Sequence, residues 1–443
     1  MKNYLMNKYD YVYIFLISFI PQLIILLLSP PILFWDEYSY LDNVKHVLLN
    51  TPYFEYYRFP LLWWILIPIS YITNFNIFFI KLFLIFIFSL STVFLYKILE
   101  EYGNKYINYI LILFYSLNGL FLVWASRIYP DVLASSLLIF SIYFYIKYFK
   151  DNKERNLILY SLFSVLSILS KYEYGLWLIS SIIFLKNKDK LKAILYSLLF
   201  LIPYFLYNLI LYHNPIFIFI KQAEIVYTYT SYQPLSLFLF NLFIFSSAYL
   251  FSLLQNPKKL ENYNRSIYLY IILAIIFLAF FAKAKDARYI LMILPPFLIL
   301  TRIFINKIKG LQFPYLFLFS LLNIISIYNG LLFLINYDTN LGNTHLNYVY
   351  KASEYLNQYN PNVVLTNVFW PMVAYYTNSQ VYIMYNATYL IPRVYPQFLI
   401  YSPNCGTPFP FNPNDYNISL IYYYVDPNDC QIYIYKVNSY VVK

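Results

Sequence analysis

The sequence predicts an α-helical polytopic membrane protein of about eleven transmembrane helices, followed by a small C-terminal α/β domain outside the membrane. Of the 443 residues, 61% are hydrophobic and only 12% are charged, whereas a soluble domain carries about 25% charged residues. Apolar runs close to the length of a membrane span recur as far as residue 337. Packing in water cannot hide that much apolar surface.

The apolar runs define a membrane part that we place at residues 1–337. The first run starts at Tyr11, and Pro30 and Pro31 follow it instead of a small-residue cleavage site. We therefore interpret it as a retained helix and not as a removed signal peptide. The expected spans begin near Tyr11, Phe75, Tyr106, Val132, Leu157, Tyr174, Leu191, Leu235, Ile267, Tyr289 and Phe313.

The distribution of basic residues sets the expected orientation. The formal net charge is +11, and an odd number of spans puts the two termini on opposite sides. With the N-terminus inside, the inner segments hold eighteen Lys and Arg residues and the outer loops between spans hold nine. The positive-inside rule therefore predicts a multi-pass plasma-membrane protein with a cytoplasmic N-terminus. Membrane topology explains the basic residues without a nucleic-acid partner.

Residues 338–443 change character and are expected to form an extracytoplasmic α/β domain. The amphipathic pattern of Asn347–Tyr359 predicts a helix. Short alternating runs predict strands at Asn362–Thr366, Gln380–Tyr385, Ile418–Val425 and Gln431–Val437.

This C-terminal part also holds the features of an exported domain. The chain has two cysteines, Cys405 and Cys430, and an oxidising compartment would allow them to form a disulfide. Glycosylation sequons start at Asn386 and Asn417. A third sequon, at Asn264, falls on the predicted inner side and carries no weight.

The first outer loop contains an adjacent pair of acids, Asp36 and Glu37, only a few residues after the first span. Two carboxylates beside a bilayer are costly unless they are solvated, paired or used. An ordinary solvated loop acid is the simplest alternative. The aromatic neighbours on both sides, Trp35 and Tyr38 among them, favour a functional role at headgroup depth.

Cations lie at several outer turns, each at the edge of an apolar segment. The simplest alternative is that these side chains extend toward lipid phosphates or form weak local ion pairs. This explanation accounts for a single cation better than for the whole set. The residues are Arg58 before Pro60, Arg127 with Asp131 in the turn Arg127-Ile128-Tyr129-Pro130-Asp131, Lys171 in Lys171-Tyr172-Glu173, and Lys285 with Arg288.

Together these motifs resemble the GT-C glycosyltransferases that use polyprenyl-monophosphate sugars. The nearest groups are the dolichyl-phosphate-mannose protein mannosyltransferases and the lipid A aminoarabinose transferases. The turn around Lys171 fits the pattern of these groups only loosely, and no large inserted outer domain is present. The matching pieces are Asp36-Glu37, Arg58-Phe59-Pro60-Leu61, Arg127 to Asp131, Asn214-Pro215, and Arg288-Tyr289-Ile290-Leu291 with Pro295-Pro296.

The resemblance implies a hexosyl- or pentosyltransferase that moves a sugar, mannose or another hexose, from a polyprenyl or dolichyl monophosphate. The acceptor would be a hydroxyl of a protein, glycan or lipid on the outer face. Asp36 would be the general base of an inverting single displacement, supported by Glu37, and Asp131 would orient the acceptor or a cation. The lipid phosphate would be bound by Arg58, Arg127, Lys171, Lys285 and Arg288.

Other readings stay open at this point. A divalent metal at Glu55, Asp131 or His213 is one, although the spacing matches no ligand motif. A multi-pass transporter or flippase is the main alternative function, since polytopic proteins with interfacial charges are often transporters. Few ionisable residues inside the expected spans and no internal repeat argue against it. A non-catalytic assembly protein is a further alternative. An oligosaccharyltransferase is disfavoured because Trp63-Trp64 is not followed by Asp.

Overall fold

A computed structural model describes residues 8–29, 33–229, 231–337, 346–409, 411–427 and 429–442. Pro30, Pro31 and the junction expected at residue 338 lie outside the described residues. The chain divides into two compact units. Unit 1 contains the chain up to Leu28 together with Tyr57–Leu62 and Phe78–Leu332, and unit 2 contains Ser29–Tyr56, Trp63–Ile77 and Phe333–Lys443.

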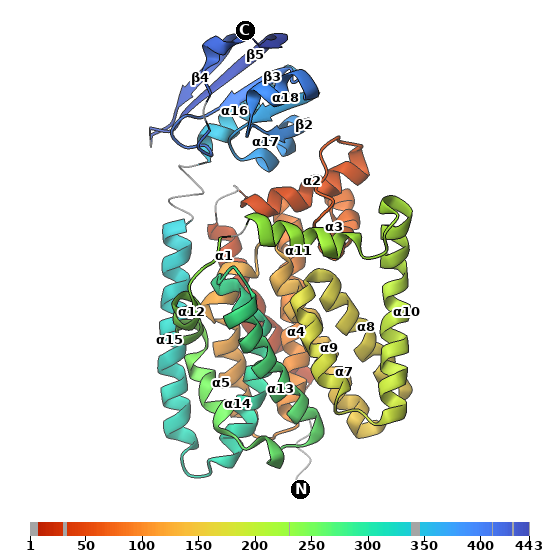
Figure 1. Ribbon diagram of the computed structural model, residues 1–443. Helices are drawn as coiled ribbons and strands as arrows, with labels where there is room; N and C mark the ends of the chain where they lie inside the picture. Colours follow the sequence, from red (N-terminus) through yellow and green to blue (C-terminus); the bar gives the residue numbers. More distant parts are fainter. Residues whose placement is uncertain are drawn as a thin grey trace. The chain divides into compact units, whose positions relative to one another are not determined.

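Unit 1 is a bundle of helices joined by short turns (Figure 1). Two short 3-10 helices used below are η1 (Tyr172–Tyr174) and η5 (Ala287–Met292). The helices are α1 (Lys8–Leu28), α4 (Ile77–Glu100), α5 (Lys105–Ser116), α6 (Gly119–Trp124), α7 (Pro130–Asp151), α8 (Glu154–Ser170), α9 (Gly175–Ile182), α10 (Asn187–Tyr212), α11 (Phe217–Tyr229), α12 (Leu235–Leu250), α13 (Asn262–Ile276), α14 (Leu294–Lys307) and α15 (Gln312–Tyr337).

Seven helical segments in the described residues are long and apolar enough to cross a membrane. They lie at 9–28, 77–100, 130–151, 187–212, 235–254, 262–281 and 312–336. The protein is thus a multi-pass membrane protein, but the expected count of about eleven spans is not confirmed. The other four expected spans correspond to shorter helices, namely α5, α8, α9 and α14.

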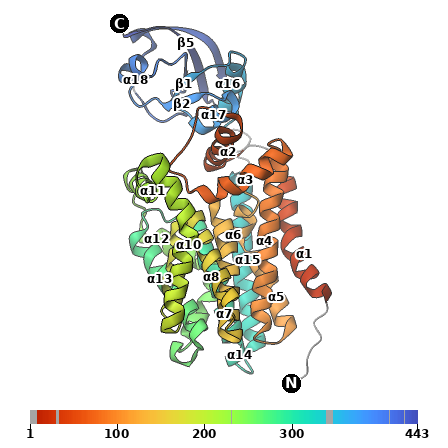
Figure 2. The ribbon, with the colours of Figure 1, turned by 90° about the vertical axis from the view of Figure 1, so that its right-hand side faces the viewer.

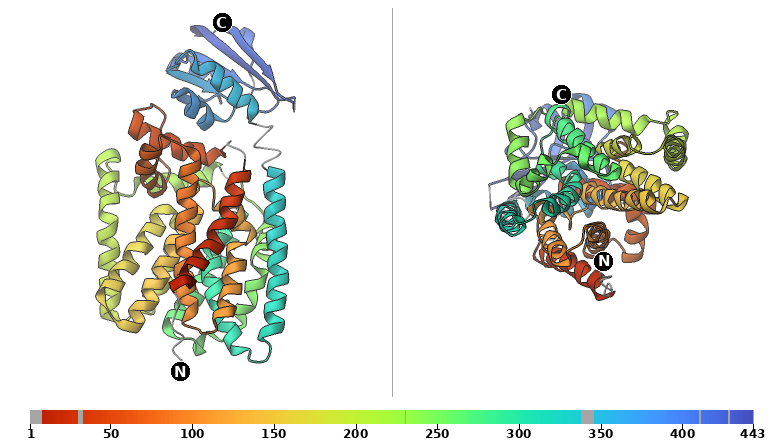
Figure 3. Two further views of the ribbon diagram at one scale, coloured as in Figure 1. Left: turned by 180° about the vertical axis from the view of Figure 1, so that it is seen from behind. Right: turned by 90° about the horizontal axis from the view of Figure 1, so that it is seen from below.

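Burial separates central helices from peripheral ones. In α7, 78% of the most apolar window is buried inside the structure, whereas the value is 17% in α10 and 28% in α15. Figures 1 and 3 show α10 and α15 at opposite flanks of the bundle. At another edge, α1 lies beside α5 (Figure 2). α7 is therefore a central helix of the bundle, whereas α10 and α15 are peripheral.

A close backbone contact in unit 1 joins α6 to α15. A Cβ built on Gly119 would lie 2.1 Å from the carbonyl oxygen of Ser326, and one built on Gly330 would lie 2.4 Å from the Cα of Gly119. The Gly119 N–H also donates to the Ser326 hydroxyl at 3.1 Å. Small residues permit this approach, which is typical of packing between membrane helices.

We expect Gly119→Ala to destabilise the protein by about 1–3 kcal/mol, because the new methyl group has no space beside backbone atoms. Thermal unfolding in one detergent measures the loss. Gly175→Ala is the matched control, since its Cβ would meet Ile168 only at an ordinary 3.8 Å. Equal melting temperatures for the Gly119 and Gly175 variants would contradict the tight crossing.

Unit 2 combines the segment that follows α1 with the C-terminal α/β domain. The segment forms α2 (Trp35–Leu49), and most of α3 (Pro60–Thr73) is grouped with it. The domain contains α16 (Asn347–Asn357), β1 (Val363–Thr366), α17 (Trp370–Thr377), β2 (Gln380–Ile383), α18 (Ala387–Val394), β3 (Phe398–Tyr401), β4 (Tyr416–Val425) and β5 (Gln431–Val442).

The domain has one five-stranded sheet in the order β2-β1-β3-β5-β4. β1 is parallel to both β2 and β3, and β5 is antiparallel to β3 and β4. The parallel strands are linked through α17 and α18, as parallel pairing requires a crossover. The small C-terminal sheet domain is confirmed, and the four expected strands correspond to β1, β2, β4 and β5.

Residues far apart in sequence hold the domain together. The sheet and α18 enclose a core that includes Leu365, Leu390 and Leu399. Cys405, in the loop after β3, forms a disulfide with Cys430, which immediately precedes β5. Asn386, the first residue of one sequon, caps α18 by accepting the N–H of Tyr389 at 3.0 Å. The disulfide therefore links the loop after β3 to the turn between β4 and β5.

Candidate active site

The centre of the candidate site in unit 1 is a buried ion pair between Lys171 and Asp131. Asp131 lies in the first turn of α7 behind Pro130, and its side chain is 3% exposed. Lys171 follows the last residue of α8 in an extended conformation, and its Nζ contacts Asp131 Oδ1. The hydroxyl of Tyr174 donates to the Asp131 carbonyl at 3.2 Å. The structure therefore brings together two residues that the sequence placed in separate turns.

Arg288 lies within η5, among aromatic rings. Its guanidinium carbon is 5.1 Å from the ring centre of Tyr129 and 5.6 Å from that of Trp124. Asp286 caps η5 and also pairs with Arg288 Nε at 3.3 Å. Such rings attract a cation and keep water away from it. The result is a cation in a partly enclosed, apolar setting.

Tyr289 connects this arginine to the buried ion pair. The Lys171 Nζ lies 3.9 Å from the centre of the Tyr289 ring, and Arg288 lies 5.7 Å from the same ring centre. Ser135 of α7 donates to the carbonyl of Leu291 at 3.2 Å, which ties α7 to η5. Lys171, Asp131 and Arg288 thus form one group around Tyr289, a motif residue to which the sequence analysis gave no role.

The surroundings of Arg58 and Arg127 differ from each other. Arg127 is buried, and its Nε donates to the Val123 carbonyl at 2.8 Å. Arg58 precedes Phe59, whose ring lies 5.6 Å from that of Tyr172, the residue after Lys171. The Arg58 segment is therefore packed directly against the turn that carries Lys171.

Lys285 has a different environment from the other cations. It is 1% exposed, and its Nζ donates to the carbonyls of Leu278, Ala279 and Ala282. These carbonyls lie in and just after the π-helical turn Phe277–Phe281 that continues α13, where helix carbonyls lack partners. All three ammonium hydrogens are used there, so the Lys285 side chain caps a helix end.

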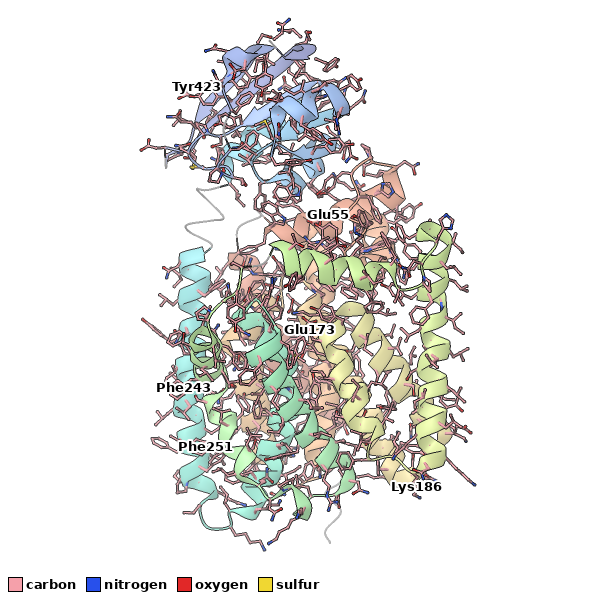
Figure 4. The ribbon with its side chains drawn as sticks, viewed as in Figure 1. Glu55, Glu173, Lys186, Phe243, Phe251 and Tyr423 are labelled. Atoms are coloured by element: carbon pink, nitrogen blue, oxygen red, sulfur yellow. A yellow bond between two sulfur atoms is a disulfide. The ribbon has the colours of Figure 1, made fainter. Side chains whose placement is uncertain are left out.

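Glu173 is a functional candidate that the sequence analysis did not assign. It is 8% exposed, and no hydrogen-bond partner for its Oε2 lies among the described residues. Burial raises the pKa of its carboxyl, and the attraction of Lys171 offsets that effect only in part. Figure 4 shows Glu173 toward one end of the bundle and Lys186 at the other. An acid in a turn between two apolar runs was the available sequence signal.

Burial and neighbouring charges also act on Lys171. Burial opposes its charge, but Asp131, Glu173 and Tyr289 together outweigh burial and raise the pKa of the ammonium. Lys171 therefore remains a cation.

We expect Glu173→Gln to be more stable than the wild type at pH 8 by about 1–3 kcal/mol. The unfolded chain ionises this carboxyl near its ordinary pKa of 4.5, whereas the folded chain does so only at higher pH. Wild-type stability therefore falls as the pH rises through this interval, and glutamine removes that loss.

Thermal unfolding at pH 4 and pH 8 tests this expectation. The two proteins should melt alike at pH 4, and Glu354→Gln, at an exposed acid of α16, should match the wild type at both values. A less stable Glu173→Gln at pH 8 would show that the ionised carboxylate is favourable in the folded protein.

In unit 2, Asp36 and Glu37 occupy the first turn of α2. The Glu37 carboxylate is fully buried and accepts the N–H of Phe34 at 2.8 Å, so it caps the helix. A helix N-terminus favours negative charge because its N–H groups are oriented toward it. Glu37 thus fixes the start of the helix on which Asp36 lies.

Polar contacts also hold the end of this loop, around Glu55, against α2. The Asn43 side chain donates to the Glu55 carbonyl at 3.1 Å and accepts the Glu55 N–H at 2.8 Å. The hydroxyl of Tyr53 donates to Glu55 Oε1 at 2.6 Å. Figure 4 labels Glu55 in this segment. Glu55 is therefore part of the frame that holds α2.

The three residues that the sequence suggested as metal ligands, Glu55, Asp131 and His213, do not form a common group among the described residues. His213 ends α10 in a left-handed conformation, with φ of 55°, and its N–H donates to the Leu209 carbonyl. Glu55 contacts Tyr53, and Asp131 contacts Lys171. Within the described ranges, no three His, Cys, Asp or Glu side chains form a group that could hold a metal ion.

Residues 57–213 match the sequence model of the family described as dolichyl-phosphate-mannose-protein mannosyltransferase. The matched segment contains Arg58, Arg127, Asp131 and Lys171. No curated protein sequence matches the chain.

The structure is similar to that of ArnT from Cupriavidus metallidurans bound to undecaprenyl phosphate. The TM-score is 0.68 at 11% identity, over 99% of this chain and 100% of that chain. The chain has a GT-C glycosyltransferase fold. Apo ArnT from the same organism gives a TM-score of 0.65 at 10% identity, covering 98% of each chain.

The GT-C fold is also shared with a longer protein. The Archaeoglobus fulgidus oligosaccharyltransferase in complex with Zn and sulfate gives a TM-score of 0.59 at 11% identity, over 95% of this chain and 72% of that chain. These matches confirm the family resemblance that the motifs indicated. The structures show the shared fold, and the family match covers residues 57–213.

Proposed function

We propose that the protein transfers a sugar, mannose or another hexose, from a polyprenyl or dolichyl monophosphate to a hydroxyl of a protein, glycan or lipid. One observation carries the proposal. The segment that matches the mannosyltransferase family supplies both Asp131 and Lys171, and these residues form a buried ion pair beside Arg288 in a GT-C fold. A buried group of this kind costs free energy and is typical of a functional site.

In the proposed reaction, Arg288 and Lys171 bind the phosphate of the donor. A guanidinium can contact two phosphate oxygens at once, and an enclosed apolar setting strengthens the attraction. Arg58 and Arg127 are further phosphate-binding candidates on the family-matched segment. Lys285 is left out of this set because helix carbonyls already accept its three hydrogens.

Asp36 acts as the general base. Its carboxylate takes the proton of the acceptor hydroxyl while the acceptor oxygen forms a bond to the anomeric carbon of the sugar. The bond from that carbon to the phosphate oxygen breaks, and the phosphate leaves with the electron pair, so it needs no proton. This single displacement inverts the anomeric centre. Glu37 supports Asp36 by capping α2, and Asp131 orients the acceptor and holds Lys171.

The reaction is proposed to occur on the outer face of the plasma membrane, with the N-terminus in the cytoplasm and the C-terminal domain outside. The excess of basic residues in the inner segments supports this orientation. The disulfide between Cys405 and Cys430 also supports it, because the cytoplasm keeps thiols reduced.

Transfer from radiolabelled donors tests the proposal. The purified protein receives polyprenyl-phosphate mannose or polyprenyl-phosphate glucose, with a membrane extract as acceptor, and label in the acceptor fraction is counted. We expect transfer from one of the two donors and release of polyprenyl phosphate in equal amount. Donor binding without transfer, for both donors and several extracts, would instead favour a transporter or flippase.

A further inference from the structure

The helix that carries Asp36 packs on the C-terminal domain along one face. Four side chains of α2 face α17 or its end, and their spacing of three, four and three residues places them on one side of a helix. They are Trp35, Tyr38, Asp42 and Lys45. Asp36, one residue after Trp35, lies about 100° further around the helix axis. Both helices belong to unit 2, and Figure 1 shows them side by side.

The first turn of α2 is held by aromatic rings. The centre of the Trp35 ring lies 4.1 Å from that of Trp370 and 4.5 Å from that of Phe369, both in edge-to-face geometry. Aromatic pairs of this kind contribute about 0.5–1.5 kcal/mol beyond the area they bury. The peptide bond that follows Trp35 leads directly to Asp36.

The middle and the end of α2 are held as well. Tyr38 is fully buried, its ring lies 5.3 Å from Tyr375, and its hydroxyl is 3.5 Å from that of Tyr376. The Lys45 Nζ donates to the Tyr375 carbonyl and, at 3.2 Å, to Asn378 Oδ1. The same Nζ lies 3.8 Å from the Tyr375 ring centre.

A helix of this length needs such support. α2 has fifteen residues, and isolated helices of about that length are only marginally stable in water. Its own loop contributes the Glu37 cap and the contacts of Asn43 with Glu55. Contacts with α17 are spread along α2, from Trp35 in its first turn to Lys45 near its end.

We propose that α17 of the C-terminal domain is the positioning element for the Asp36 carboxylate, acting through Trp35, Tyr38 and Lys45. This inference rests on the proposed function, since it assigns Asp36 as the base. Loss of the contact should leave donor binding intact and lower the rate of transfer, because a displacement of about 1 Å in a catalytic group can cost about a hundredfold in rate. Trp370 and Tyr375 are thus positioning residues and not catalytic ones.

The test compares Trp370→Ala with Trp370→Phe and Tyr423→Ala. We expect Trp370→Ala to lower kcat about tenfold to hundredfold with an unchanged Kd for polyprenyl-phosphate sugar. The phenylalanine variant should recover most of the rate. Tyr423 is an exposed residue of β4 in the same domain (Figure 4), and its variant should retain wild-type kcat. Lys45→Met changes α2 itself and replaces Trp370→Ala if that variant does not fold.

Hydrogen exchange without substrate gives a second readout. Backbone amides of α2 should exchange faster in Trp370→Ala than in the wild type, while those of α7 should be unchanged. A folded Trp370→Ala with wild-type kcat, or with unchanged exchange in α2, would overturn the inference. An equal loss of donor affinity would also overturn it, since α17 would then support donor binding. If the wild type transfers no sugar at all, the proposed function fails, and exchange still decides whether α17 holds α2.

Discussion

Asp36→Asn should lower the rate of sugar transfer by about 10²–10⁴-fold, the usual contribution of a positioned general base. Asparagine has nearly the same shape but cannot take the proton of the acceptor hydroxyl. Donor binding should be unchanged, because the proposed phosphate ligands are other residues. Single-turnover transfer from the preferred polyprenyl-phosphate sugar, together with a separate binding measurement, gives the two quantities.

Asp415→Asn is the matched control for this change. Asp415 is an exposed acid at the end of a short turn before β4, and its substitution makes the same chemical change in unit 2. Its variant should transfer sugar at the wild-type rate. Transfer that persists in Asp36→Asn would keep the enzyme and remove Asp36 as its base.

Arg288→Ala should lower kcat/KM for transfer by about 10²–10³-fold, as expected when a group that stabilises developing charge is removed. The departing phosphate gains negative charge as its bond to the sugar breaks. Arg288 lies among Trp124, Tyr129 and Tyr289, where the low local dielectric strengthens its attraction to that charge. Initial rates at several donor concentrations separate the effects on kcat and KM.

Arg288→Lys should be intermediate, since lysine keeps the charge and loses the two-pronged contact. Arg393→Ala is the control. Arg393 is an exposed arginine of α18 whose guanidinium stacks at 3.6 Å on Tyr389. If Arg288→Ala transfers sugar as fast as Arg393→Ala, Arg288 does not bind the leaving phosphate.

Hydropathy predicted the class of fold well, because bilayer insertion depends on averaged apolar character. It could not show where a helix stops inside an apolar run. The expected span near Tyr106 ends at Ser116, and Asn118 starts α6 by accepting the N–H of Leu120 at 3.1 Å. A single capping side chain makes this break, and an average over about twenty residues does not detect it.

Part of the candidate site could also be predicted from the sequence. Motif order selected Asp131, Lys171 and Arg288, which unit 1 brings together around Tyr289. The role of a cation depends on its partners, however, and sequence shows none of them. Lys285 resembles the others in sequence, yet it caps helix carbonyls.

The contacts between α2 and α17 could not be predicted from the sequence. Trp35 and Trp370 are separated by more than three hundred residues and meet only in the folded chain. The sequence revealed an aromatic setting around Asp36, but propensity and periodicity describe neighbours along the chain. They give no information about which distant aromatic residues complete that setting.

The outward faces of α10 and α15 have a consequence for every measurement on this protein. Among the described residues, little of the most apolar window of either helix is buried, so lipid or detergent tails must act as the solvent of these helices. The absolute melting temperature is therefore a property of the whole protein–amphiphile particle. The order of melting temperatures among variants at enclosed positions such as Gly119 should be the same in different detergents. For variants on α10, that order should change with the length of the detergent tail.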